Sequence, residues 1–131
     1  PLCSPVLVNK GAAMLEPADV LKLRLLHLVD YTDWETWFRN AGLDPKLAQT
    51  GVVLSDMNLV YSASVAAQGV AMGDEFISRQ AMEMGHLVRL FDVGIRPAST
   101  YYLVVSEGRA RNEAVAAFCS WLKQEVRKTE D

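Results

Sequence analysis

The chain has little of what a disulfide framework, a zinc centre or a nucleic-acid surface requires. Its 131 residues include two cysteines, Cys3 and Cys119, and no Cys-x-x-Cys unit, so both thiols are expected to be reduced. Its net charge is −3, with 13 Lys and Arg scattered along the chain, which gives no electrostatic footprint for nucleic acid. No apolar run is long enough to span a membrane and no signal peptide is visible. We therefore expect a cytoplasmic protein that does not use a membrane.

Catalytic motifs are missing as well. The sequence has no Walker loop, no dinucleotide fingerprint and no Gly-x-Ser-x-Gly elbow. His27 and His86 lie in apolar, strand-like stretches, where a structural histidine is more common than a general base. We expect no enzyme activity, no metal and no cofactor. The enzymatic alternative is a small α/β enzyme that uses Ser4 or Cys3, and it has no base to activate either group.

What the sequence does have is a regular alternation of strands and helices, which predicts an α/β fold with a largely parallel or mixed sheet. The expected strands are residues 1–8 with a break at Ser4–Pro5, 25–29, 52–54, 70–72, 87–91 and 100–105. The expected helices are residues 16–21, 34–41, 57–67, 78–84 and a long final helix capped by Asn112. The final helix has an apolar stripe of Ala114, Val115, Phe118, Cys119, Leu122 and Val126. This stripe needs a sheet to cover it, and Cys119 is expected in the core.

Ser55 and Asp56 follow the expected strand 52–54, at a strand-to-helix turn. In α/β proteins such a turn presents a helix N-terminus to polar ligands. A short polar side chain at the same place also caps the helix, and capping is the simpler interpretation. The helix that follows is rich in small residues, which favours close packing on a sheet.

A second turn, residues 30–32, precedes an aromatic helix. Trp34, Trp37 and Phe38 share one helical face at spacings i, i+3 and i+4, and we expect that face to lie in the core. The hydroxyls of the turn carry no fixed charge, which would suit a small polar molecule in a cleft. Thr32 or Asp33 is expected to cap the helix, and Gly42 to follow its end.

Several stretches, taken in order, resemble the effector-binding domain of LysR-type transcriptional regulators, in the branch that regulates glycine cleavage and chromosomal β-lactamase. They are Cys-Ser-Pro at 3–5, WETWFRNAGL at 34–43, ASVAAQGVAMG at 63–73, GHLVRLF at 85–91, TYYLV at 100–104 and FCSWL at 118–122. The sequence departs from the family where Ala67-Gln68 replaces the usual Gly-x before Gly69-Val70, and at Gly85-His86. These departures leave the effector undefined.

The resemblance implies a type II periplasmic-binding-protein-like fold: two α/β lobes, each a mixed sheet with flanking helices, joined by crossover strands. The chain would be an incomplete two-lobe domain. Residues 1–15 would be a remnant of the first lobe and a crossover strand, 16–98 the second lobe, and 99–131 the return crossover strand and C-terminal helix. A small effector would bind between the lobes, and DNA would be bound only by a helix-turn-helix outside this chain. The resemblance implies a tetramer for the parent protein. For this chain, an apolar helix stripe without its sheet and open strand edges predict a homodimer or strand exchange.

By position in the family, the effector contacts of the second lobe would come from the two turns described above. One turn gives Ser55, Asp56 and Met57; the other gives Asp30, Tyr31 and Thr32. Ser4, near the hinge, is a further candidate. If Asp56 faces the cleft, a cationic or amine-bearing effector is favoured, whereas an Asp56 that only caps its helix carries no such implication. A lobe of a periplasmic-type solute-binding protein, which shares the fold, is the alternative.

Overall fold

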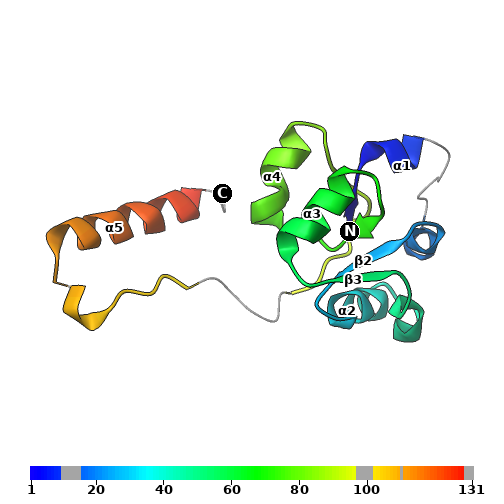
Figure 1. Ribbon diagram of the computed structural model, residues 1–131, viewed down its shortest axis with the longest axis horizontal. Helices are drawn as coiled ribbons and strands as arrows, with labels where there is room; N and C mark the ends of the chain where they lie inside the picture. The colour runs from blue at the N-terminus through cyan, green and yellow to red at the C-terminus, as the bar shows by residue number, and fades with distance from the viewer. Residues whose placement is uncertain (10–15, 97–101, 110, 129–131) are drawn as a thin grey trace. The chain divides into compact units, whose positions relative to one another are not determined.

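A five-stranded mixed sheet lies at the centre of the first 96 residues (Figure 1). Its strands are β1 (Leu2–Cys3), β2 (Leu25–Leu28), β3 (Val52–Leu54), β4 (Val70–Ala71) and β5 (Val88–Arg89), in the order β3-β2-β4-β1-β5. Strand β2 pairs in parallel with β3 and β4, and β1 pairs antiparallel with β4 and β5. The expected mixed α/β sheet is therefore confirmed.

The computed structural model describes residues 1–9, 16–96, 102–109 and 111–128. They belong to two compact units, Pro1–Arg96 (unit 1) and Pro97–Asp131 (unit 2). Because β1 pairs between β4 and β5, residues 1–9 belong with the rest of unit 1. This grouping differs from the expected boundary between residues 15 and 16.

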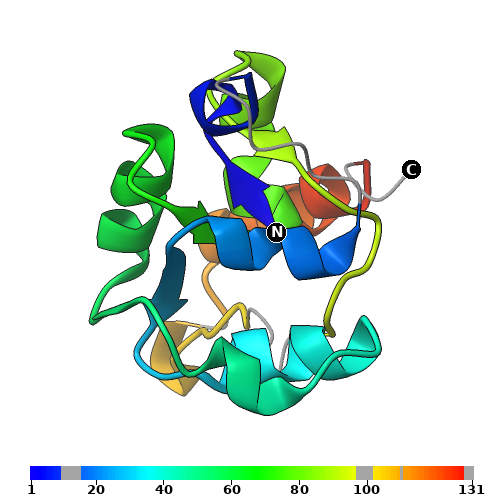
Figure 2. The same cartoon turned by 90° about the vertical axis from the view of Figure 1, so that its right-hand side faces the viewer.

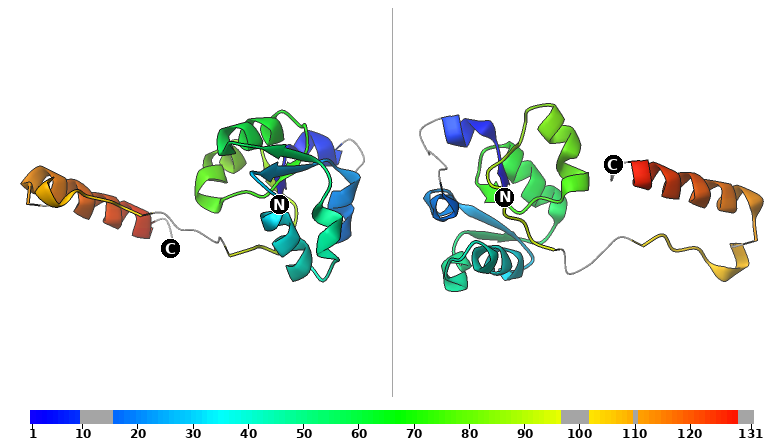
Figure 3. Two further views of the ribbon diagram at one scale, coloured as in Figure 1. Left: turned by 60° about the horizontal axis from the view of Figure 1, so that its bottom comes forward. Right: turned by 180° about the vertical axis from the view of Figure 1, so that it is seen from behind.

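Side-chain alternation along the short strands divides the core of unit 1 between the two faces of the sheet. Cys3, Leu25 and Val70 point to one face and join the cluster that contains Trp34. Their neighbours Leu2, Leu26 and Ala71 point to the other face and pack with Val60 of α3 (Met57–Val65) or Ala81 of α4 (Glu75–Glu83). Helices therefore cover both faces, with α3 and α4 opposite α2 (Thr32–Asn40) (Figures 1 and 3).

Helix α2 buries the aromatic face that the sequence predicted. Trp34, Trp37 and Phe38 are at most 1% exposed, and their rings meet edge-on or tilted at centroid distances of 5.5–6.0 Å. Each indole N–H donates to a backbone carbonyl, that of Trp34 to Leu26 (2.9 Å) and that of Trp37 to Val93 (2.8 Å). A buried indole needs such an acceptor.

Helix α3 lies close to the sheet because its inward positions are small. Ser64 is 1% exposed and its hydroxyl donates to the carbonyl of Leu2 (3.2 Å). Gly69, after the helix, has no room for a Cβ, which would collide with the carbonyl of Arg24 and the side chain of Leu26. The small-residue pattern is thus a packing feature, as predicted.

Short helices replace some of the expected loop and strand. Pro5 opens α1 (Pro5–Asn9) where the sequence predicted a broken strand through residue 8. Proline fits the first helical position because its missing N–H needs no partner there. The expected helix at 16–21 is a 3-10 helix, Pro17–Lys22, and a further 3-10 helix, Pro45–Ala48, packs on α2.

Unit 2 consists of a 3-10 turn (Glu107–Arg109) and helix α5 (Glu113–Lys128) in its described part. Asn112 caps α5 as predicted: its side-chain oxygen accepts from the amides of Ala114 (3.0 Å) and Val115 (3.3 Å). Residues 102–105 form no strand, contrary to expectation, because no described residue pairs with them; residues 100 and 101 lie outside the described part. Cys119 is only partly buried rather than a core residue.

The ends of α2 and α3 allow a prediction about stability, because one is followed by a glycine and the other by an alanine. Helices α2 and α3 are both followed by a residue with positive φ, Gly42 (76°) and Ala67 (58°). A left-handed residue with a Cβ costs about 1–2 kcal/mol, partly offset by the greater unfolded-state freedom of glycine. Ala67→Gly should raise the free energy of unfolding by about 0.5–1 kcal/mol, and Gly42→Ala should lower it by a similar amount. Urea denaturation followed by tryptophan fluorescence measures both, and equal signs for the two changes would contradict this explanation.

Candidate functional site

The two candidate turns lie side by side at one edge of the sheet. Leu28 at the end of β2 is in register with Leu54 at the end of β3, and the amide of Val29 donates to the carbonyl of Leu54 (2.7 Å). Strand β4 is parallel to β2 and ends at the same edge. We call this the carboxyl edge; it comprises residues 29–32, 55–57 and 72–74. Ligands of open α/β sheets bind at such edges.

The turn after β2 is centred on a strained residue. Val29 has a φ of 66° and its side chain is 66% exposed. The amide of Asp30 donates back to the carbonyl of Leu28 (2.7 Å), which closes a three-residue turn. Positive φ is rare for a β-branched residue, and a turn of this kind is strained. Sequence patterns could not predict this turn, because a β-branched residue after Leu28 is typical of a longer strand.

Asp30 organises the start of α2. Its Oδ1 accepts from the amide of Thr32 (2.8 Å), and this hydrogen bond, with one to the Thr32 side chain, holds the pKa of the exposed Asp30 carboxyl below its usual value. Burial raises the pKa of Asp33, and the negative charge of Asp30 raises it further. The expectation that Thr32 or Asp33 caps this helix was wrong: Tyr31 occupies the cap position without a side-chain bond. The tight turn at Val29 brings Asp30 within reach of an amide two residues on.

Tyr31 lies on His27, a buried residue of β2. The two rings meet edge to face at 4.8 Å between centroids, and Tyr31 remains 36% exposed. The Nε2 atom of His27 lies 2.6 Å from the carbonyl of Thr50. Because a carbonyl only accepts, Nε2 is the donor of this bond and carries a proton. The buried Nδ1 has no hydrogen-bond partner, so the structural role predicted for His27 leaves half of the ring unsatisfied.

The second turn is exposed and leads into the N-terminus of α3. Asp56 is the cap residue, and its Oδ1 accepts from the amide of Asn58 (2.7 Å). Ser55 and Asp56 are exposed, and Met57 is partly buried. The capping interpretation of Asp56 is therefore confirmed, and a capping carboxylate gives no ground for expecting a cationic ligand.

Ser4 lies away from the other six candidates. Strand β1 runs antiparallel to β4, so the residue after β1 is at the opposite edge of the sheet. Ser4 is 5% exposed and immediately precedes α1. The structure thus brings together Asp30, Tyr31 and Thr32 with residues 55–57, but not Ser4.

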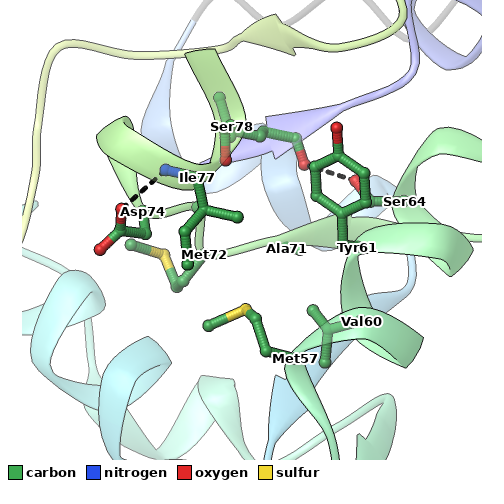
Figure 4. A pocket seen from close by; sticks show the side chains of 11 residues that line it. Met57, Val60, Tyr61, Ser64, Ala71, Met72, Asp74, Ile77 and Ser78 are labelled. Carbon is green, nitrogen blue, oxygen red and sulfur yellow. Dashed lines mark hydrogen bonds between the residues drawn. The ribbon is translucent and has the colours of Figure 1, made fainter. Parts of the chain in front are cut away.

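A small apolar pocket adjoins the carboxyl edge between α3 and α4 (Figure 4). Met57 and Val60 line it from α3, Met72 from the end of β4, and Ile77 from α4. Its free interior admits little more than one water-sized group. Met57 therefore lines a largely apolar pocket, which no pattern in the sequence indicated.

His86 is exposed in the turn before β5, not in the apolar strand-like surroundings expected for it. No metal-binding cluster of His, Cys, Asp or Glu occurs among the residues that the structure describes. Within the same residues, no helix is long and apolar enough to cross a membrane.

Residues 1–127 match the family model described as the LysR substrate binding domain. The glycine cleavage system transcriptional activator of Escherichia coli is 32% identical over 122 residues, which are 93% of this chain and 40% of that protein. The transcriptional activator AmpR of Enterobacter cloacae is 27% identical over 129 residues, 98% of this chain and 43% of that protein. The chain therefore spans less than half the length of these relatives.

Solved structures of effector domains share the fold. The effector domain of the regulator AmpR of Pseudomonas aeruginosa matches with a TM-score of 0.77 at 24% identity, covering 99% of this chain and 64% of that one. The AmpR effector binding domain of Citrobacter freundii gives 0.71 at 24% identity, covering 97% and 62%. The fold is thus that of periplasmic-binding-protein-like effector domains.

The two thiols should differ in reactivity. Cys3 is fully buried, and burial raises its pKa to about 11. Only about one thiol in a thousand would be ionised at pH 8, and the thiolate is the reactive form. Folded protein treated with a chromogenic disulfide reagent at pH 8 should therefore react at Cys119 and not at Cys3, whereas both should react in denaturant. A Cys119→Ser control isolates Cys3, and rapid labelling of that variant when folded would contradict the prediction.

Proposed function

Because this chain belongs to the LysR substrate-binding-domain family, we propose that its carboxyl edge contacts the small-molecule effector of a parent transcriptional regulator. The chain is the effector-binding portion of such a regulator rather than a solute-binding protein of the same fold. Unit 1 would correspond to the second lobe and unit 2 to part of the first. Effector contacts would come from Tyr31 and Thr32 on one turn and from residues 55–57 on the other.

One observation carries this proposal: unsatisfied and strained groups cluster at the turn after β2. Val29 holds a positive φ, at a cost on the order of 1–3 kcal/mol. Two residues earlier, the buried Nδ1 of His27 has no partner, a further cost of about 1–3 kcal/mol. Folds keep such departures from local stability mainly where function needs them. Leu54 and the turn after it lie directly beside this place.

The chemistry of the edge favours a small polar effector. Tyr31 and Ser55 offer exposed hydroxyl groups that both donate and accept. The carboxylates of Asp30 and Asp56 are engaged with backbone amides, so neither provides a reason to require a positive charge on the ligand. Ser4 is not among the contacts proposed for the carboxyl edge, because it lies at the opposite edge of the sheet.

The proposed mechanism is a population shift. An effector that binds one conformation better than another changes the equilibrium by its differential affinity alone, so no covalent chemistry is needed. In the parent protein this shift would alter the hold of a tetramer on DNA, through a DNA-binding part outside these residues. The site of action would be the cytoplasm.

Calorimetry on the parent regulator tests the proposed contacts. A panel of small polar metabolites (free amino acids, dicarboxylic acids and amino sugars) is titrated into wild type and into the double variant Tyr31→Phe, Ser55→Ala. Each lost hydrogen bond is worth about 1 kcal/mol, so the double variant should bind a hit about 10–30-fold more weakly. The control is Ser62→Ala, which removes a hydroxyl group from an exposed residue of α3 outside the carboxyl edge. Equal affinities for the double variant and this control would overturn the site assignment.

Self-association of this chain is a second expectation. On α5, Phe118 and Trp121 are 55% and 53% exposed, with their rings 5.6 Å apart. Adjoining apolar side chains of this size favour association, and we expect a homodimer. Size-exclusion chromatography with light scattering should show a dimer that Phe118→Ser, Trp121→Ser converts to monomer. Val104→Ser, at a residue 85% exposed, is the control, and a monomeric wild type would contradict the expectation.

A further inference from the structure

The chain leaves unit 1 through a stretch without regular structure, residues 91–94, which we call the exit strap. Each of its four consecutive carbonyls accepts a hydrogen bond from a side chain. Arg89 donates through Nε to Phe91 (3.1 Å) and through an Nη to Asp92 (3.4 Å). Trp37 donates through Nε1 to Val93 (2.8 Å), and Asn40 through Nδ2 to Gly94 (3.0 Å). Side chains thus hold the strap where a neighbouring strand would otherwise do so.

Two of these donors come from α2, the helix that starts at the candidate effector turn. Figure 2 shows the chain after β5 running towards this helix. Thr32 lies in the first turn of α2, and its amide donates to the Asp30 carboxylate. Asn40 is the last residue of the helix. A helix of this length spans about 13 Å as one stiff element. It therefore connects the turn at one end with the exit strap at the other.

The contacts that hold α2 differ along its length. Trp34 is buried and bonded to β2, and the Trp37 ring is buried against Phe91 at a centroid distance of 6.0 Å. Asn40 is exposed, so its hydrogen bond competes with water and is weaker. Buried contacts therefore fix the middle of α2, whereas a weaker, exposed hydrogen bond holds its last residue.

We propose that Trp37 and Asn40 are positioning residues that transmit a change at the effector turn to the exit strap, and so to the chain beyond Arg96. The inference rests on the proposed function for the meaning of the signal, but the coupling itself is a property of α2. A ligand that shifts the start of the helix changes the fit of both donors on the carbonyls of Val93 and Gly94. Because coupling is reciprocal, weakening the hydrogen bonds to the strap must also speed hydrogen exchange at the Thr32 amide.

Nitrogen-15 NMR on the full chain tests the coupling without any ligand. Asn40→Asp keeps the side-chain shape but removes the donor, and Arg39→Ala is the control at the neighbouring exposed residue. In Asn40→Asp, hydrogen exchange of the Trp37 indole N–H should be about tenfold faster, as expected for one lost hydrogen bond. The Thr32 amide should exchange about threefold faster, and the Trp34 indole should be unchanged. Arg39→Ala should leave all three groups as in wild type.

Two results would overturn the proposal. If the Thr32 amide exchanges in Asn40→Asp as it does in Arg39→Ala, the strap and the turn are not coupled. If both buried indoles exchange faster by the same factor, Asn40 contributes only to global stability. Failure of the metabolite titration leaves this test unaffected, since no ligand takes part in it. Conversely, a metabolite that binds at the edge while Thr32 stays insensitive would retain the effector site and remove the transmission.

Discussion

The fold of unit 1 depends on two indole groups that cannot be buried without acceptors. Trp34 and Trp37 stand one helical turn apart on α2, and both are almost completely buried. One donates to the middle of β2 and the other to the exit strap. These two bonds fix where α2 lies on the sheet. Because α2 starts at the turn after β2, they also determine where Tyr31 and Thr32 are presented.

The direction of the strands then decides which polar residues meet. Strands β2, β3, β4 and β5 run in one direction, and β1 runs in the other. The turns after β2 and β3 are more than twenty residues apart in the sequence, yet they lie side by side at one edge. Aspartates accept from first-turn amides of all three helices that start there: Asp56 and Asp74 as cap residues of α3 and α4, and Asp30 from the residue before the cap position of α2. The first role of these carboxylates is therefore structural, as acceptors for the amides at the helix starts. The strained Val29 lies in the turn after β2, two residues after His27 with its unpartnered nitrogen, and the exposed Tyr31 and Ser55 lie at the same edge.

In the proposed arrangement, recognition and transmission would use the two ends of α2. The carboxyl edge would bind, and the exit strap would carry the consequence to the rest of a regulator. Nothing catalytic is required of either end.

The sequence alone determined the α/β class, the buried face of α2, the caps at Asp56 and Asn112, and the family, because periodicity, capping chemistry and ordered motifs are local. Only the tertiary structure decided the place of Leu2–Cys3 inside the sheet, the separation of Ser4 from the other candidates and the absence of a strand at residues 102–105. It also revealed the turn at Val29 and the exit strap. Each of these depends on which distant backbone groups pair, and pairing between distant segments is not encoded in the local pattern of either one.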